Sequence, residues 1–324
     1  MREMSSSIGS NLVKRIRRSA SFGIVMILLI LCIFLSFASD QFLTQENLLS
    51  VFRQFSFIGI MAIGECMVII TGGIDLSVGS IFAFAGVTSA FAMTKMGMST
   101  FAGLLVGLVS GLLFGLMNGL FVTRLNLPPF IATLGTLSIA RGLSYALTSG
   151  FPLPNLPDAF KFIGQGYIGV IPFPVILLLL LGVIFTFFLN NTVTGRRVYA
   201  TGSNEEAARV SGVNTKQVKM LVYSLSGLLA GLSGMATAAR LGVAQSTAGI
   251  GYELDAIAAV IIGGASVAGG VGTVFGAIIG AAIMGVLKNG LILLSVSAYW
   301  QQTVIGAVII LAVTFDLLRH KIKT

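Results

Sequence analysis

The feature of this sequence that most constrains its fold is a succession of long apolar runs joined by short polar segments. A helix that crosses a bilayer needs roughly 20 apolar residues, and lipid offers no hydrogen-bond partners to backbone outside a helix or a closed barrel. Runs of suitable length cover residues 22–38, 53–70, 76–94, 100–122, 129–147, 168–189, 218–239, 253–268, 271–294 and 300–318. The pattern therefore predicts an all-α, polytopic membrane protein with about ten transmembrane helices.

Composition agrees with lipid as the solvent for most of the chain. Of the 324 residues, 56% are hydrophobic and only 10% are charged, and the mean hydropathy is +0.98. Such values are typical of membrane proteins and exclude an ordinary water-soluble domain. We expect a single membrane domain over residues 1–324, with cytoplasmic tails at residues 1–21 and 319–324 and a helical bundle at residues 22–318.

The first apolar run follows a basic segment, as it does in a secretory signal peptide. No small-residue cleavage site comes after it, because the next residues read SDQFLTQEN. We therefore predict a retained first helix. Cys32 and Cys66 lie within apolar runs and form neither a CxxC pair nor a disulfide framework, so they do not indicate a redox compartment.

The placement of basic residues predicts the orientation in the membrane. Most of the 20 lysines and arginines fall on one side if the N-terminus is cytoplasmic, which is the bias that cytoplasmic loops show. With an even number of spans, both termini of this multi-pass protein would be cytoplasmic. The net charge of +9 is then explained by loops facing lipid headgroups, and no nucleic acid partner is predicted. The one histidine, His320, lies in the basic tail, so neither a catalytic nor a metal site is expected.

One interior segment is unusually polar for such a chain. Residues 202–219 read GSNEEAARVSGVNTKQVK and hold two glutamates, an arginine and two lysines. Ser203 and Asn204 are good helix caps, and Ser203 with Glu206 three residues later has the form of a capping box. Gly212 is placed to end the helix in a left-handed conformation. We predict a short helix of about two turns in water.

The residues inside this predicted helix agree with its ends. Glu205 and Glu206 occupy the first turn, where the helix dipole favours acids, and Ala207 and Ala208 propagate the helix. A helix this short is unstable by itself and needs a surface to pack against. Two interpretations stay open on this chemistry alone, namely a solvated connecting helix and a docking element for a cytoplasmic partner protein.

Three stretches together resemble a known family. EEAARVSG is similar to the EAA...G signature of ABC importer permeases, and GGIDLSVGS at residues 72–80 and GYELDAIAAVIIGGASVAGG at residues 251–270 resemble ribose and related monosaccharide permeases. The resemblance covers nearly the whole chain after the first helix. Glu65 and Lys288 depart from the pattern, which leaves their role open.

The resemblance implies a type II ABC importer-like permease that carries a monosaccharide, most closely ribose, by alternating access. Its partners would be a cytoplasmic ABC ATPase subunit, an exterior or periplasmic sugar-binding protein, a second permease copy in a homodimer, and membrane lipid. The residues implied in ATPase coupling are Glu205, Glu206, Ala207, Ala208, Arg209 and Gly212. No G-x-x-x-x-G-K-[ST] loop is present, so ATP and Mg²⁺ would bind to the partner ATPase, and the chain itself would be no enzyme and hold no cofactor.

Two pairs of similar segments suggest an internal repeat. VIITGG ends at Gly73 and VIIGG at Gly264, and GLVSGLLFGLMNGL ends at Leu120 whereas GAIIGAAIMGVLKNGL ends at Leu291. Paired glycine-rich segments are typical of duplicated transporters. The spacing between the landmarks differs in the two halves, and glycines four residues apart also serve close helix packing, so both interpretations stay open.

Polar residues within the apolar runs are the candidates for a translocation pathway, since polar groups in lipid are costly and usually face a bundle interior or water. The predicted pathway residues are Asp75, Asn118, Asp255 and Asn289. Structural roles compete with this prediction: Asp75, Glu253 and Asp255 would cap nearby helices, and Arg141 would pair with a carboxylate.

Two rival functions also stay open. In an ion-driven secondary transporter, Glu65, Asp75 and Asp255 would bind protons or cations. The other rival is a membrane scaffold that transports nothing. The transported solute is open as well, because a permease for another sugar or a nucleoside would have the same architecture.

Overall fold

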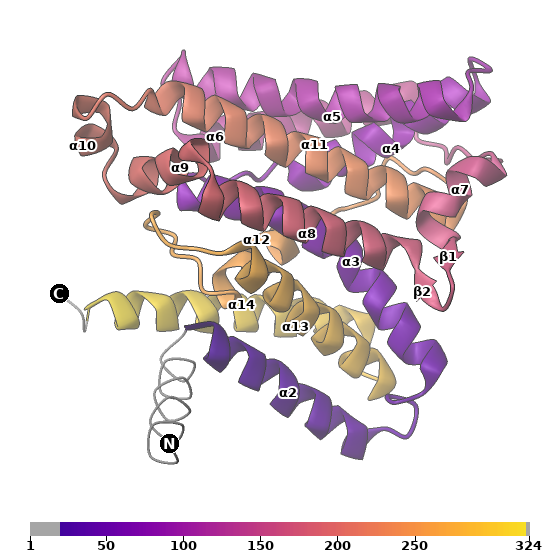
Figure 1. Cartoon of the computed structure of the whole chain (residues 1–324). Helices are drawn as coiled ribbons and strands as arrows, with labels where there is room; N and C mark the ends of the chain where they lie inside the picture. The colour runs from indigo at the N-terminus through magenta and orange to yellow at the C-terminus, as the bar shows by residue number, and fades with distance from the viewer. Residues whose placement is uncertain (1–19, 322–324) are drawn as a thin grey trace, which may run out of the picture.

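A computed structural model describes residues 20–321, and it shows a bundle made almost wholly of α-helices (Figure 1). In chain order the elements are α2 (Ala20–Ala38), α3 (Gln45–Ile70), α4 (Val78–Thr94), α5 (Thr100–Thr123), α6 (Pro129–Thr148), α7 (Asp158–Gln165), β1 (Tyr167–Ile168), β2 (Ile171–Pro172), α8 (Phe173–Asn191), α9 (Val193–Ser203), α10 (Glu205–Val210), α11 (Thr215–Leu241), α12 (Tyr252–Ile262), α13 (Val274–Leu293) and α14 (Ala298–Lys321). The predicted all-α class is confirmed, with one short antiparallel β1–β2 hairpin added.

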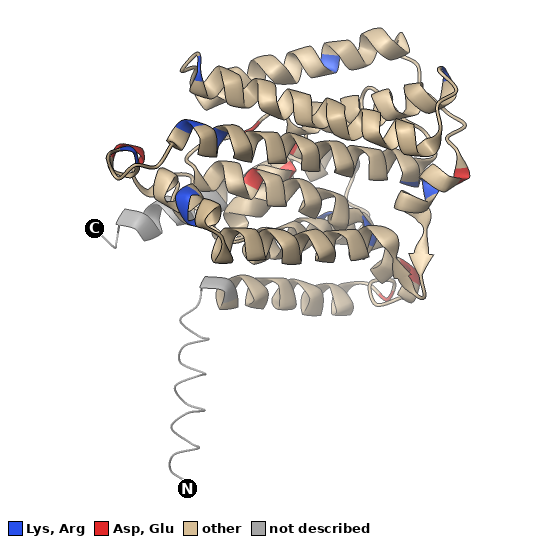
Figure 2. Ribbon diagram, turned by 45° about the horizontal axis from the view of Figure 1, so that its top comes forward, with Lys and Arg blue, Asp and Glu red and all other residues tan. Residues whose placement is uncertain are grey.

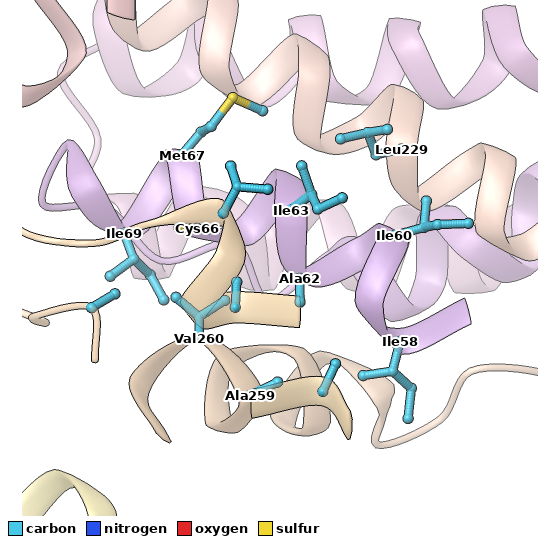
Figure 3. Close-up of a cluster of buried hydrophobic side chains, with 14 of the residues drawn as sticks. Ile58, Ile60, Ala62, Ile63, Cys66, Met67, Ile69, Leu229, Ala259 and Val260 are labelled. Carbon is cyan, nitrogen blue, oxygen red and sulfur yellow. The ribbon is translucent and has the colours of Figure 1, made fainter. Parts of the chain in front are cut away.

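Helix α3 is the centre of the bundle. Every residue from Ser56 to Ile70 is buried, because α11 covers one side of this helix and α12 and α13 cover another. Figure 3 shows Ile60 and Ile63 of α3 beside Leu229 of α11, and Ala259 and Val260 of α12 on the other side of α3. A helix that is apolar all round is expected to be buried in this way.

Close backbone packing joins α5 to α11. A Cβ atom added at Gly111 would lie 2.5 Å from the carbonyl oxygen of Gly227, and one added at Gly115 would lie 2.4 Å from that of Tyr223. On α13, a Cβ at Gly280 would lie 1.9 Å from the carbonyl oxygen of Ala259. Both glycine ladders therefore have a packing role, as small residues do between membrane helices. The internal repeat is not confirmed.

Six helices of the described chain are long and apolar enough to cross a membrane, namely α3, α5, α6, α8, α11 and α13. A helix lies in each of the ten predicted ranges, but the count of ten spans is not confirmed. Helix α12 has only 11 residues, about 16 Å at 1.5 Å per residue, which is roughly half of a bilayer core. It stops because Gly264 adopts φ +86° and turns the chain, although the apolar run continues.

Most of the charged residues lie at the two ends of the bundle, and a few lie in its interior (Figure 2). Helices α9 and α10 lie at one end, together with the start of α2 and the end of α14, and α7 with the hairpin lies at the other (Figure 1). Residues 1–19 and 322–324 of the predicted tails lie outside the described residues. Large apolar side chains point outward between the ends, for example Leu179, Val183 and Phe187 of α8, as a lipid-facing surface requires.

Candidate functional site

The short polar helix predicted at residues 205–213 is present as α10. Its N-cap is Asn204, whose Oδ1 accepts a hydrogen bond of 2.9 Å from the backbone N–H of Ala207. Gly212 ends the turn with φ +85°, in the left-handed region where glycine is unstrained. The predicted helix and its glycine stop are thus confirmed.

The predicted capping box is wrong. Ser203 is the last residue of α9, and its hydroxyl donates to the carbonyl oxygen of Tyr199 at 2.9 Å. Glu206 does not reach back to the cap but binds the guanidinium of Arg209 at 2.7 and 2.8 Å. The reason is that α9 continues through Ser203, so its hydroxyl bonds to the preceding turn of its own helix.

One ion pair and one buried side chain hold α10 in place, and a second ion pair lies within the helix. The carboxylate of Glu205 lies 2.5 Å from Nζ of Lys219 on α11, and the hydrogen bond that Arg209 donates to Glu206 raises the pKa of the Arg209 guanidinium. Exposed pairs contribute at most about 1 kcal/mol each. Ala208 is buried, so the packing of this side chain fixes which face of α10 points outward.

The outward face of α10 carries both charge and an apolar side chain. Glu205, Glu206 and Arg209 are exposed, and Val210 is 79% exposed at the end of the helix. The sequence analysis did not single out Val210, although an apolar residue beside three charges in a water-facing turn is a signal for contact with another protein. A small, rigid helix with this mixture is suited to insertion into a complementary surface.

Helix α9 joins α10 to the core by direct backbone contact. A Cβ atom added at Gly202 would lie 1.7 Å from the carbonyl oxygen of Ile70 at the end of α3. That same oxygen accepts a 2.8 Å hydrogen bond from the N–H of Gly270, and Tyr199 donates to the carbonyl oxygen of Gly272 at 2.8 Å. The glycine-rich segment at residues 263–273, the end of α3 and α9 therefore form one junction.

Two of the four predicted pathway residues, Asp75 and Asn118, lie together in the core. Asp75 Oδ1 accepts hydrogen bonds from Ser77 N–H at 2.9 Å, from Ser77 Oγ at 2.5 Å and from Asn118 Nδ2 at 3.3 Å, and Oδ2 accepts from Ser226 Oγ at 3.1 Å. Glu65 Oε1 in turn accepts from the N–H of Asp75 at 3.1 Å. We call Glu65, Asp75, Ser77, Asn118, Tyr223 and Ser226 the buried polar cluster.

The other two predicted pathway residues lie elsewhere. Asp255 in the first turn of α12 forms a nearly buried ion pair with Lys288 of α13. Asn289 exchanges two hydrogen bonds with Asn47 in the first turn of α3, at 2.7 and 3.1 Å. The structure thus does not bring the four residues to one place.

The predicted structural roles are partly wrong. Two of the three expected capping residues do bond to a helix start: Asp75 Oδ1 accepts from the backbone N–H of Ser77, the N-cap of α4, and Glu253 Oε1 accepts from that of Gly251, the N-cap of α12, at 3.2 Å. Asp255 does not cap α12 but pairs with Lys288. Arg141 does not pair with a carboxylate: it donates to the carbonyl oxygens of Ser246, of Ala248 at 2.8 Å and of Gly79 at 3.3 Å. Its partners are therefore carbonyl oxygens of the loop between α11 and α12 and of the first turn of α4.

These features define a class of protein. The chain is a polytopic helical membrane protein with a buried polar core and a small exposed helix, rigidly attached, at one end of the bundle. Ionisable residues inside such a bundle commonly mark a substrate or ion pathway.

The comparisons with known proteins give the family. The family model for the permease component of branched-chain amino acid transport systems matches residues 47–313, and the chain belongs to this permease family. The ribose import permease of Bacillus subtilis (strain 168) is 45% identical over 291 residues, 89% of this chain and 90% of that protein. Its counterpart in Escherichia coli (strain K12) is 42% identical over 296 residues, 89% of this chain and 91% of that protein.

A further relative, a D-allose transport system permease of Escherichia coli (strain K12), is 40% identical over 303 residues, 93% of this chain and 92% of that protein. No solved structure matches the chain. The resemblance to sugar permeases inferred from the three motifs is thereby confirmed.

Proposed function

We propose that this chain is the membrane-spanning permease subunit of an ATP-driven importer that carries a monosaccharide by alternating access, with ribose as the first candidate and allose as the second. The observation that carries the proposal is the identity of 45% and 42% to two ribose import permeases over 89% of this chain. The allose permease, 40% identical, supports the second cargo.

The energy would come from a partner. The chain has no phosphate-binding loop of the common type, so ATP and Mg²⁺ would bind to a cytoplasmic ATPase subunit. Helix α10 would fit a cleft on that subunit, with Glu205, Glu206, Arg209 and Val210 on its exposed face. This assignment makes the α10 end of the bundle cytoplasmic and both termini cytoplasmic.

The attachment of α10 supports a mechanical role. Its N-terminal side is held to the end of α3 through Gly202, and its C-terminal side continues into α11 after a turn at Gly212. A displacement of α10 by the ATPase would therefore reach the central helix and α11 together. Packed helices respond to such a displacement as rigid bodies, which is the motion that alternating access needs.

The remaining partners follow from the same role. A second copy of the chain would complete the pathway as a homodimer, and an exterior or periplasmic binding protein would select and deliver the sugar. Asp75 with Asn118, Asp255 with Lys288, and Asn289 with Asn47 would then line or bound the pathway at different depths.

Reconstitution tests the proposal. The permease is placed in vesicles with the ATPase and the binding protein that copurify with it from native membranes, and the uptake of labelled ribose and allose is measured with and without ATP. We expect ribose uptake that requires ATP and the binding protein. Uptake driven by an ion gradient without nucleotide would favour a secondary transporter, and no uptake of either sugar under any condition would overturn the proposed cargo.

A further inference from the structure

The buried polar cluster holds two carboxyl groups without a cation. Glu65 and Asp75 are both 0% exposed. The four ion pairs found among residues 20–321 involve neither of them. Glu65 accepts a hydrogen bond from the backbone N–H of Asp75, so the two residues are neighbours. Two negative charges in one low-dielectric site repel each other, and an unpaired buried charge is costly even alone. One of the two carboxylates therefore needs a cation or a proton.

The hydrogen bonds show which group carries the charge. Asp75 accepts four hydrogen bonds, from Ser77 N–H, Ser77 Oγ, Asn118 Nδ2 and Ser226 Oγ. Donors directed at a carboxylate stabilise its ionised form. Glu65 accepts only one, from the N–H of Asp75, and its Oε2 has no partner. The environment of Asp75 suits an anion, and that of Glu65 does not.

Two other oxygens of the cluster also lack partners. Asn118 Oδ1 and the hydroxyl of Tyr223 make no hydrogen bond, although Asn118 is 0% and Tyr223 is 1% exposed. Both side chains come from helices that pack on the cluster, α5 and α11 respectively, and Asn118 already binds Asp75 through its other atom. Protonation would make Glu65 Oε2 a donor, and the cluster holds one acceptor that lacks a donor, Asn118 Oδ1, whereas the Tyr223 hydroxyl can donate or accept.

We propose that the buried polar cluster is a proton-binding site in which Glu65 is a neutral carboxylic acid and Asp75 is ionised. The proton resides on Glu65 Oε2, and one negative charge remains, held by the four donors to Asp75. The site lies where the irregular segment at residues 71–77 packs between α3 and α11, so the proton stabilises the closed packing of this segment.

The surrounding titratable groups supply no alternative counter-charge. Cys66 on α3 and Tyr223 on α11 lie near Glu65, and both are neutral or negative in any protonation state. Tyr199 on α9 lies beyond Cys66. On α12 and α13, Asp255 and Lys288 are paired with each other, and the cluster residues of α5 and the α4 N-cap, Asn118 and Ser77, do not titrate.

Infrared spectroscopy of the purified full-length permease in lipid nanodiscs tests the site without any ATPase or sugar. The wild-type protein is expected to show the carbonyl stretch of a protonated carboxyl group that persists in alkaline buffer. Glutamate labelled with carbon-13 at the side-chain carboxyl should shift this band and labelled aspartate should not. This result would show, without any variant, that the protonated group belongs to a glutamate.

Variants then locate the proton. Glu65→Gln, which imitates the neutral acid in shape, should remove the band, whereas the matched control Glu46→Gln, an exposed acid on the same helix, should keep it. The thermal stability of the wild-type protein should fall as the buffer becomes alkaline, and that of E65Q should fall less.

Three outcomes overturn the proposal. The first is the absence of the band in the wild-type protein. The second is its loss in Asp75→Asn together with its persistence in E65Q, which would place the proton on Asp75. The third is its disappearance when sodium or potassium ions are added at constant pH, which would show that a metal cation occupies the cluster. Since no transport is measured, failure here is separate from failure of the proposed function.

Discussion

The contact between Gly202 and the end of α3 gives a sharp prediction for the substitution Gly202→Ala. The added methyl carbon would lie 1.7 Å from the carbonyl oxygen of Ile70 and 2.7 Å from the backbone nitrogen of Gly270, and backbone atoms cannot move aside as a flexible side chain can. The Ile70 oxygen is also the acceptor of the 2.8 Å bond from Gly270. The methyl group therefore enters an occupied hydrogen bond.

The size of the effect follows from the steric clash of the added methyl group and from the lost hydrogen bond. Forcing an extra methyl group into a packed site costs about 1–3 kcal/mol, and a lost hydrogen bond costs about 0.5–1.5 kcal/mol. A total of about 2–4 kcal/mol is a large fraction of a typical folding free energy of about 5–15 kcal/mol. Because α9 lies at the edge of the bundle, we expect α9 and α10 to shift away from α3 while the spans stay folded.

The assay measures thermal unfolding and the coupling of sugar transport to ATP hydrolysis. Purified G202A permease should unfold a few degrees below the wild-type protein, and in vesicles it should move fewer sugar molecules per ATP hydrolysed. The matched control is Gly142→Ala on α6, where nothing lies within 4 Å of the added carbon, so this variant should unfold at or slightly above the wild-type temperature. A G202A protein with unchanged unfolding and unchanged coupling would refute the assignment of Gly202 as the rigid link.

Three further predictions rest on other contacts. Lys288→Met should lower the unfolding free energy by about 3–5 kcal/mol, because Asp255 would stay buried without its partner, and adding Asp255→Asn should recover most of the loss in a thermal melt. Asn204→Ala should cost about 0.5–2 kcal/mol through the lost α10 cap, and proteolysis at this end of the bundle should become faster. Glu206→Lys or Gly212→Trp should abolish ATP-dependent uptake while membrane insertion, measured by fractionation, is unchanged; normal uptake in both would contradict the coupling role of α10.

The sequence predicted the parts of the fold that depend on local chemistry. The apolar runs place a helix in each predicted range, and the segment around Asn204 and Gly212 forms the expected short helix, because caps and left-handed glycines act within a few residues. The hairpin, α7 and α9 were not predicted. The hairpin takes the first residues of the predicted span 168–189, and α7 is a short amphipathic helix whose Phe160 packs in one cluster with Ala239 of α11, a contact between distant residues.

Contacts between residues far apart in the chain could not be predicted from the sequence. Asp255 and Lys288 lie 33 positions apart on different helices, and nothing local shows that they form an ion pair. Asp75 and Asn118 are 43 positions apart in the same way. Arg141 was expected to pair with a carboxylate of opposite charge, but loop carbonyl oxygens such as that of Ala248 accept its hydrogen bonds instead.

The position of α3 joins the separate sites into one mechanical argument. At one end of this helix, Asn47 holds α13 through Asn289, and at the other end Ile70 holds Gly270 and contacts Gly202. The buried polar cluster lies one to two turns from that second end, at Glu65. We therefore expect a displacement of α10 that moves α3 to change the distance between Glu65 and Asp75 as well. When Glu65 is neutral, such a movement costs little free energy, because only the charge of Asp75 must keep its hydrogen-bond donors. If Glu65 were charged, the movement would also change the repulsion between two carboxylates. The coupling of sugar transport to ATP hydrolysis would then depend on pH, and measuring this dependence together with that of thermal stability would report the motion of α3.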